Sequence, residues 1–194
     1  MTKKELRSYI KNQVAVHQNE LQDFSKKICS DISSSLEFLN SQIIFSYMPL
    51  KDEVNLLLLV DSIFSSGKKI ALPRVDVESG SMDFYLFDNP DDFKRGTEIG
   101  YCGIQEPSQN IKIALEKINP LLIKEKALIL VPGRAFTKSG LRLGRGKGFY
   151  DSYLARLCRL ENFYFAGVCF PFQIVNSIPV ASNDIPVHKV FSCF

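Results

Sequence analysis

The segment from Arg142 to Asp151 collects residue types that bind phosphate. It reads Arg-Leu-Gly-Arg-Gly-Lys-Gly-Phe-Tyr-Asp and contains a single carboxylate. Its cations are Arg142, Arg145 and Lys147, and its alternating glycines are Gly144, Gly146 and Gly148. Glycines let a backbone approach an anion and turn its N–H groups toward it, while arginine and lysine bind phosphate oxygens. This many cations suit a polyphosphate, and Asp151 is a candidate ligand for the Mg²⁺ that accompanies ATP.

Each of these residues also has an ordinary structural explanation. Glycine-rich segments are often turns, exposed arginines and lysines are often solvated, and an aspartate at a helix start is often a cap. The residues nevertheless fall within one predicted connection between a strand at residues 127–131 and a helix that begins near Asp151. Their concentration in one connection favours a phosphate site.

The commoner phosphate motifs do not fit this segment. A P-loop requires a glycine where Leu141 stands and a hydroxyl residue where Gly148 stands. The dinucleotide fingerprint requires a glycine one residue after Gly148 and a tight turn directly after its strand. We therefore expect neither a P-loop nor a nicotinamide or flavin site.

Composition favours one cytoplasmic domain without nucleic acid or membrane partners. The 194 residues, 45% of them hydrophobic, are enough for one core and suggest a single domain over residues 1–194. The net charge of +3 is small, and no apolar run is long enough to cross a membrane or to act as a secretion signal. The cysteines form no C-x-x-C pair, and with two histidines neither a zinc site nor a serine triad is expected. We expect a monomer.

Hydrophobic periodicity predicts alternating helices and strands. Helices are expected in residues 3–35, as two segments, and in 55–65 and 151–160, and strands in 43–47, 69–72, 82–87, 127–131, 164–169 and 190–193. Pro73 is expected to end its strand, and residues 88–120 are expected to form a long surface excursion near the site. This alternation predicts an α/β fold, a three-layer α/β/α sandwich with a mainly parallel sheet. Met48 and Glu53 would then follow a strand at the sheet edge where ligands bind.

The glycine-rich segment resembles the signature of the 5-formyltetrahydrofolate cyclo-ligase family, also called 5,10-methenyltetrahydrofolate synthetases. The resemblance extends over nearly the whole chain. It is carried by Lys3-x-x-x-Arg7, residues 47–54, Leu72-Pro73-Arg74, residues 103–107, Pro132-Gly133, Ala135-Phe136, Gly140 and Arg142 to Asp151.

The resemblance implies an enzyme that uses Mg²⁺ and ATP to convert 5-formyltetrahydrofolate to 5,10-methenyltetrahydrofolate through a phosphorylated formyl group, with release of ADP and phosphate. It implies nucleotide binding by Lys3, Arg7, Arg142, Gly144, Arg145, Gly146, Lys147, Gly148 and Tyr150. Arg145 and Lys147 would also stabilise charge during phosphoryl transfer, and Asp151 would bind the metal. Folate binding falls to Met48, Glu53, Glu106 and Phe149.

Several of these assignments have alternatives. Lys3 and Arg7 are spaced by one helical turn, which ordinarily indicates a solvated face, but the resemblance favours a second phosphate clamp opposite the glycine loop. Glu53 could be an acid that stabilises a helix start, and Glu106 an exposed loop acid. Tyr150 could belong to the buried face of its helix.

Some positions depart from the family pattern, and other functions remain open. Thr137 stands where an aspartate is common, Arg134 where a small or apolar residue is common, and Asn183 and His188 replace an expected histidine and aspartate. A phosphate-binding isomerase or transferase would bind a sugar phosphate and ignore ATP. A nucleotide- or RNA-binding module would spread its basic residues over a surface, whereas here they gather on one loop and one helix.

Overall fold

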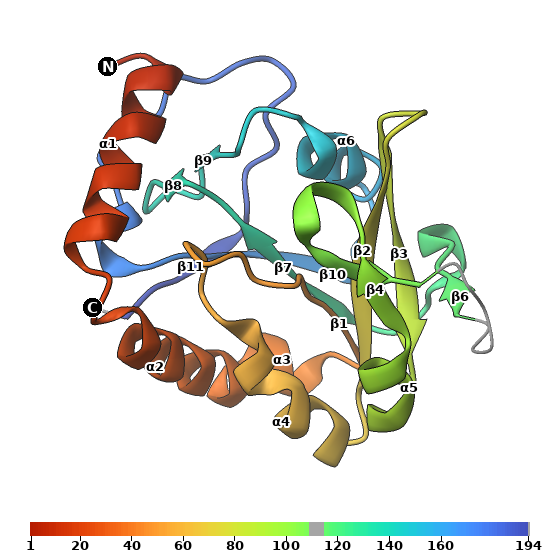
Figure 1. Cartoon of the computed structure of the whole chain (residues 1–194). Helices are drawn as coiled ribbons and strands as arrows, with labels where there is room; N and C mark the ends of the chain where they lie inside the picture. The colour runs from red at the N-terminus through yellow and green to blue at the C-terminus, as the bar shows by residue number, and fades with distance from the viewer. Residues whose placement is uncertain (109–114, 194) are drawn as a thin grey trace.

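The computed structural model describes residues 1–108 and 115–193 and is built around a seven-stranded sheet (Figure 1). The strand order is β11-β10-β7-β1-β2-β3-β6, in which the strands from β11 to β2 are parallel and β3 and β6 are antiparallel additions. The sheet strands are β1 (Ile43–Phe45), β2 (Lys69–Asp76), β3 (Ser81–Phe87), β6 (Glu116–Lys117), β7 (Ala127–Pro132), β10 (Phe163–Val168) and β11 (Lys189–Phe191). The mainly parallel sheet that the sequence predicts is thus confirmed.

Helices and short hairpins complete the chain. The helices are α1 (Lys3–Val16), α2 (Leu21–Ser34), α3 (Leu36–Asn40), α4 (Val60–Ser65), α5 (Pro90–Arg95) and α6 (Phe149–Ala155). Single 3-10 turns are η1 (Leu56–Leu59), η2 (Tyr101–Gly103), η3 (Pro120–Leu122) and η4 (Pro171–Gln173). Two small antiparallel pairs lie outside the main sheet, β4 (Thr97–Ile99) with β5 (Gln105–Pro107) and β8 (Ala135–Phe136) with β9 (Arg142–Leu143).

The central strands are apolar on both faces because helices cover both faces. Ile44 packs with the helices α2, α3 and α4, whereas its neighbours Ile43 and Phe45 pack on the side of α6. The same alternation separates Leu128 from Ile129, as expected when successive side chains point to opposite faces. Figure 1 shows α6 on one side of the sheet and α2, α3 and α4 on the other, which confirms the three-layer arrangement.

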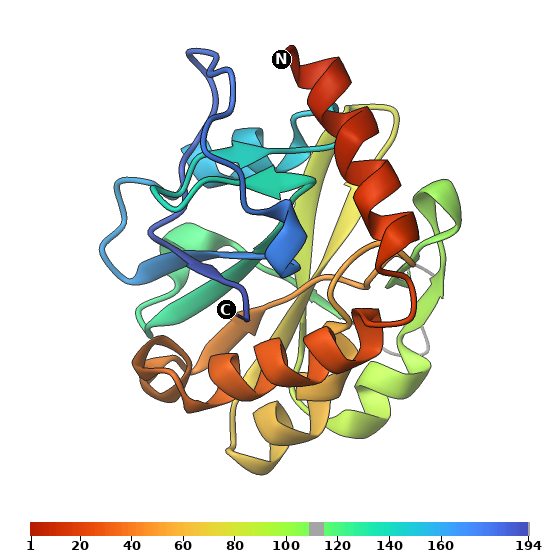
Figure 2. The ribbon, with the colours of Figure 1, turned by 90° about the vertical axis from the view of Figure 1, so that its left-hand side faces the viewer.

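Helix α1 packs outside these layers. Its buried residues Leu6 and Ile10 join Leu143, Ala135 and Ile178 in a separate apolar cluster. In Figure 2 the helix lies toward the viewer, away from the α2 layer. Thr2 caps the helix, since its side chain accepts a hydrogen bond from the backbone N–H of Glu5. This packing holds the N-terminal cations of α1 beside the segment that follows β9.

Several predicted boundaries were wrong for identifiable reasons. Pro73 does not end its strand, because β1 stops at Phe45, opposite Ala71, so no neighbour on that side needs the missing N–H of the proline. The helix expected over 55–65 begins as the 3-10 turn η1. The helix expected over 151–160 starts earlier, after the left-handed Gly148, and gives way to turns beyond Ala155.

The predicted surface excursion over residues 88–120 contains more structure than expected. It forms α5, the β4–β5 pair and β6, while its residues 109–114 lie outside the described part. Across the described ranges, no helix is long and apolar enough to span a bilayer.

Candidate active site

A cavity of about 570 Å³ lies beside the carboxyl ends of the parallel strands β1, β2 and β7. Its walls come from α1, the loop after β1, strand β2, residues 101–106, the loop between β9 and α6, and residues 181–184. Predicted site residues on its wall are Lys3, Arg7, Met48, Glu53, Glu106, Arg142, Gly144, Arg145, Gly146, Lys147, Gly148, Phe149, Tyr150 and Asp151. Every residue predicted for the site therefore lies on the wall of one cavity.

The loop from β9 to α6 requires its glycines. Gly146 and Gly148 have φ angles of 105° and 76°, a left-handed conformation that residues with a side chain rarely adopt. At Gly144 a Cβ atom would lie 2.8 Å from Nη1 of Arg142, so a side chain there would displace the arginine. The glycine spacing in the sequence thus reflects a backbone that bends sharply along the cavity wall.

Helix α1 contacts this loop through Arg7. The Nε of Arg7 donates a 2.9 Å hydrogen bond to the carbonyl of Gly144. One turn earlier, Nζ of Lys3 forms a 2.7 Å ion pair with Asp184. Both cations face the cavity, and the one-turn spacing places them on the same side of the helix.

Arg142 and Asp151 form an ion pair within the loop. Nη2 of Arg142 lies 2.7 Å from Oδ1 of Asp151, and the side chains are 5% and 17% exposed. The same carboxylate oxygen accepts a hydrogen bond from the backbone of Ile185, 3.3 Å away. The Arg142 guanidinium also lies over the ring of Tyr150, at 5.9 Å from its centre. Asp151 therefore balances a buried positive charge.

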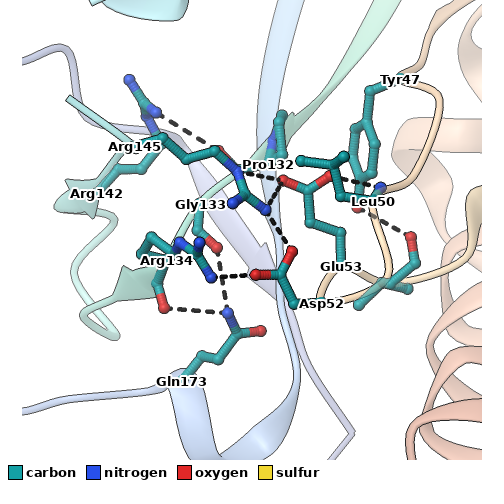
Figure 3. Close-up of polar contacts among 11 residues, drawn as sticks. Tyr47, Leu50, Asp52, Glu53, Pro132, Gly133, Arg134, Arg142, Arg145 and Gln173 are labelled. Carbon is teal, nitrogen blue, oxygen red and sulfur yellow. Dashed lines mark hydrogen bonds and ion pairs between the residues drawn. The ribbon is translucent and has the colours of Figure 1, made fainter. Parts of the chain in front are cut away.

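Arg145 bridges to two acids in the loop after β1 (Figure 3). Its Nη2 lies 2.5 Å from Asp52 and 2.8 Å from Oε1 of Glu53, and its Nε donates to the same Glu53 oxygen at 3.0 Å. Asp52 is also paired with Arg134. Burial alone would raise the pKa of Asp52, but the hydrogen bonds and charges of Arg145 and Arg134 hold it below its usual value.

Lys147 differs from these cations. It is exposed on the cavity wall, and within the described ranges it forms no ion pair. A lysine that is not held by an acid is available to an incoming anion. It is therefore the cation of the loop whose charge is least compensated by the protein.

Glu106 and Phe149, two of the residues predicted to bind folate, line the cavity together with Tyr101. Glu106 is only 4% exposed, and burial raises the pKa of its carboxyl group even though the backbone N–H groups of Tyr101 and Val75 hydrogen-bond to it. The ring of Tyr101 meets that of Phe149 edge to face at 6.2 Å. Glu106 is thus not an exposed loop acid.

Tyr150 combines the two alternatives considered from the sequence. It lines the cavity and also packs against the core beneath α6. Its hydroxyl group is buried and has no hydrogen-bond partner among the residues that the structure describes, and burial raises its pKa.

The positions that depart from the family pattern have different surroundings. Asn183 lines the cavity, whereas Arg134 lies behind it. Thr137 accepts a hydrogen bond from the backbone of Leu141 within a turn. His188 holds the sheet, because its Nδ1 accepts a 2.9 Å hydrogen bond from the backbone of Phe165.

Sequence reasoning missed part of the cavity wall. Pro73, Val75, Met82, Tyr101 and Asp184 also line the cavity. Asp184 is next to a position that departs from the family pattern, which is a weak signal. Val75 and Met82 carry no local signal, since only the pairing of β2 with β3 brings them to the site.

A metal site made by the protein alone is not evident. Among the described residues, no group of three or more His, Cys, Asp or Glu side chains is close enough to hold an ion. Glu53, Asp151 and Asp184 are carboxylates beside the cations of the wall, and each is engaged by a cation.

Comparisons with known proteins agree on one family. The model of the 5-formyltetrahydrofolate cyclo-ligase family matches residues 1–192. The 5-formyltetrahydrofolate cyclo-ligase of Mus musculus is 29% identical over 163 residues, covering 79% of this chain and 74% of the mouse protein. That of Saccharomyces cerevisiae is 28% identical over 194 residues, covering 94% and 91%.

Solved structures give the same answer. The 5,10-methenyltetrahydrofolate synthetase of Aquifex aeolicus has a TM-score of 0.79 and 32% identity, covering 99% of this chain and 90% of that one. The synthetase of Mycoplasma pneumoniae shares the fold, with a TM-score of 0.73, 21% identity and 98% coverage of both chains. The chain belongs to the 5-formyltetrahydrofolate cyclo-ligase family, as its motifs predict.

Proposed function

We propose that the protein converts 5-formyltetrahydrofolate to 5,10-methenyltetrahydrofolate with Mg²⁺ and ATP, releasing ADP and phosphate. The observation that carries this proposal is the arrangement of one cavity. Cations from the glycine loop and α1 gather on part of its wall, and the wall also carries apolar side chains, such as Met48, Met82 and Phe149, and the carboxyl group of Glu106. A polyphosphate next to a flat, partly polar ring system matches this division of the wall.

The phosphate groups would bind between the glycine loop and α1. Lys147 is available to them directly, while Lys3 and Arg7 approach from the helix. The left-handed glycines leave room for close approach of the phosphates. Arg142 would contribute mainly by fixing the loop, because its charge is already paired with Asp151.

The chemistry requires positioning more than acid or base catalysis. The formyl oxygen on N5 attacks the γ-phosphorus, an O–P bond forms, and ADP leaves. N10 then attacks the formyl carbon and loses its proton, and the C–O bond breaks to release phosphate. A formyl oxygen is a weak nucleophile, so alignment and charge stabilisation by Arg145 and Lys147 would supply much of the rate.

The residues present are compatible with Mg²⁺ bound through ATP. In ATP sites this ion is usually held by one or two carboxylates together with the phosphates, so it does not require a cluster of protein acids. Asp151 is the proposed carboxylate, and the ion would offset negative charge on the phosphates. Because Asp151 also holds Arg142, the two roles would share one side chain.

The folate would occupy the part of the cavity lined by Met48, Glu53, Glu106 and Phe149, beside the phosphate groups. Glu53 can accept hydrogen bonds from the amino-pyrimidine edge of a pterin, and Met48 and Phe149 can pack on its rings. Oε2 of Glu53 is held by the backbone N–H of Leu50 at 3.1 Å, which fixes the carboxylate plane. Glu106 would close the pocket from the β5 side.

A coupled assay tests the proposal. Protein, Mg-ATP and 5-formyltetrahydrofolate are mixed, and the absorbance of the methenyl product is followed while ADP is measured in the same samples. We expect one ADP for each product molecule, no product without ATP, and a loss of at least tenfold in kcat/KM for Lys147→Ala, about 1.4 kcal/mol. Product formation without ATP consumption would contradict the proposal.

The proposal extends to a monomer that acts in the cytoplasm. Light scattering of the purified protein at assay concentrations tests the first part. A mass twice that of the 22.0 kDa chain would refute it.

A further inference from the structure

Asp52 holds two arginines, Arg134 and Arg145 (Figure 3), and of the two it is Arg145 that lines the cavity. Its Oδ1 pairs with Arg145 at 2.5 Å, and its Oδ2 pairs with Arg134. Arg145 and Glu53 are part of the cavity wall, whereas Asp52 and Arg134 lie behind it. Asp52 and Arg134 can therefore act on a ligand in the cavity only through Arg145.

Arg145 is engaged by acids through Nε and Nη2, which make three contacts with Glu53 and Asp52. Under the proposed function Arg145 binds ATP, and turning this side of its guanidinium toward a phosphate group would break some of these contacts. The free energy that this exchange costs depends on what each acid retains afterwards.

Both acids retain a partner when Arg145 leaves. Glu53 keeps the hydrogen bond from the backbone of Leu50. Asp52 keeps Arg134, so a carboxylate whose side chain is only 25% exposed does not lose all its positive partners. Without Arg134, the departure of Arg145 would leave Asp52 charged and unpaired in a partly buried position, which is costly.

The backbone of Arg134 is held on both sides by hydrogen bonds. Its N–H donates a 2.7 Å hydrogen bond to the carbonyl of Leu143. Its carbonyl accepts a 3.0 Å hydrogen bond from Nε2 of Gln173, a side chain that is 2% exposed. The turn after β7 thus presents the Arg134 side chain from a rigid base.

We infer that Arg134 is a positioning residue for Arg145: it keeps Asp52 paired while Arg145 turns from Asp52 toward the phosphates of ATP. The inference rests on the proposed function, because it takes ATP as the ligand that recruits Arg145. It assigns a role to a cation at a position where the family commonly has a small or apolar residue.

Binding of a non-hydrolysable ATP analogue with Mg²⁺, measured by titration calorimetry, tests the inference. Arg134→Leu should weaken binding about tenfold, and Arg134→Lys should restore most of it. The double variant Arg134→Leu/Asp52→Asn should also bind nearly as well as the unsubstituted protein, because the carboxylate that would be left unpaired is gone and Arg145 keeps only its contacts with Glu53. Thermal unfolding of each variant establishes that it is folded.

A matched control separates pairing from net charge. Arg134→Leu/Asp83→Asn has the same net charge as the Asp52 double variant, but Asp83 pairs with Lys117 and Arg156 away from the cavity. Recovery only with Asp52→Asn supports the inference.

Three outcomes would overturn it. These are unchanged binding in Arg134→Leu, no recovery with Asp52→Asn, or equal recovery with Asp83→Asn. If the unsubstituted protein binds no analogue, both the proposed function and this inference fail. That result is distinguishable from the three outcomes above, because each of them requires that the unsubstituted protein binds the analogue.

Discussion

Replacing Asp151 with asparagine tests the ion pair at the centre of the glycine loop. Asparagine keeps the size of the side chain and can still accept the hydrogen bond from the backbone of Ile185. It removes the negative charge opposite the Arg142 guanidinium and leaves the positive charge in place. The variant thus leaves a cation that is 5% exposed without the negative charge that lies 2.7 Å from it in the unsubstituted protein.

The expected loss of stability follows from this burial. Removing one partner of a buried ion pair typically costs about 3–5 kcal/mol. Water partly reaches Asp151, and the carbonyl of Pro132 remains 3.4 Å from Nη1 of Arg142, so we expect the lower end, about 3 kcal/mol. For a chain of 194 residues this corresponds to a fall in Tm of about 6–12 °C.

The assay is thermal and urea unfolding of the protein without ATP and Mg²⁺. Under these conditions any role of Asp151 in metal binding cannot contribute to the measured stability. An assay of turnover would not separate the two roles, because loss of the ion pair and loss of the metal ligand would both lower it. A second variant, Arg142→Met/Asp151→Asn, removes both charges and should regain part of the lost stability. Asp83→Asn is the control, because its partners Lys117 and Arg156 are half exposed and such pairs contribute at most about 1 kcal/mol.

Two results would refute the reasoning. One is a fall in Tm of less than about 2 °C for Asp151→Asn, below the shift expected for 1 kcal/mol. The other is a double variant that is less stable than the single one. Either result would mean that Arg142 does not depend on Asp151 in the ligand-free protein.

Three further predictions concern pH and backbone conformation. Because burial raises the pKa of Glu106, the contribution of this group to stability should fall as pH rises above 4.5. In urea unfolding, Glu106→Gln should therefore be more stable relative to the unsubstituted protein at pH ~8 than at pH ~5. An equal difference in unfolding free energy between the two proteins at both pH values would contradict this. Because burial lowers the pKa of His188, stability should be lost as pH falls below 6.5. The variant His188→Asn keeps an acceptor for the backbone N–H of Phe165 and should weaken this pH dependence. The same pH profile of stability in the variant and the unsubstituted protein would contradict the role of His188. The variants Gly148→Ala and Gly67→Ala should each lose about 1–2 kcal/mol of unfolding free energy, since both glycines have positive φ and open space around a new Cβ. Only Gly148→Ala should also weaken ATP binding. Equal effects of the two variants on ATP binding would contradict the assignment of the loop to phosphate binding.

Strands in the middle of the sheet could be predicted from sequence, because burial on both faces leaves a continuous apolar run. Residues 127–131 are an example, and the strand found there is one residue longer. The extension of β2 through Pro73 could not be predicted, since it depends on where the neighbouring strand ends. The short β4–β5 pair was missed for a similar reason, because three-residue strands carry too little pattern to be recognised.

The same distinction applies to the site. The glycine loop was predictable because its residues are adjacent in the chain and its glycines have a conformational cause. Glu53, which the sequence placed at the site, lies on the cavity wall, but the pairing of Asp52 with Arg134 spans 82 positions and has no local signal in the sequence. Partners brought together by the sheet topology are visible only in three dimensions.

The charges of the cavity suggest how a site for a polyphosphate remains stable when it is empty. Several cations close together repel one another, and burial adds a desolvation cost. Here Lys3, Arg142 and Arg145 are each paired with an acid, while exposed Lys147 is not. The acids thus take the place that phosphate oxygens would occupy, and binding becomes an exchange of partners in which the arginines need not first be desolvated. On this argument, the affinity for ATP depends as much on what holds the displaced acids as on the cations themselves.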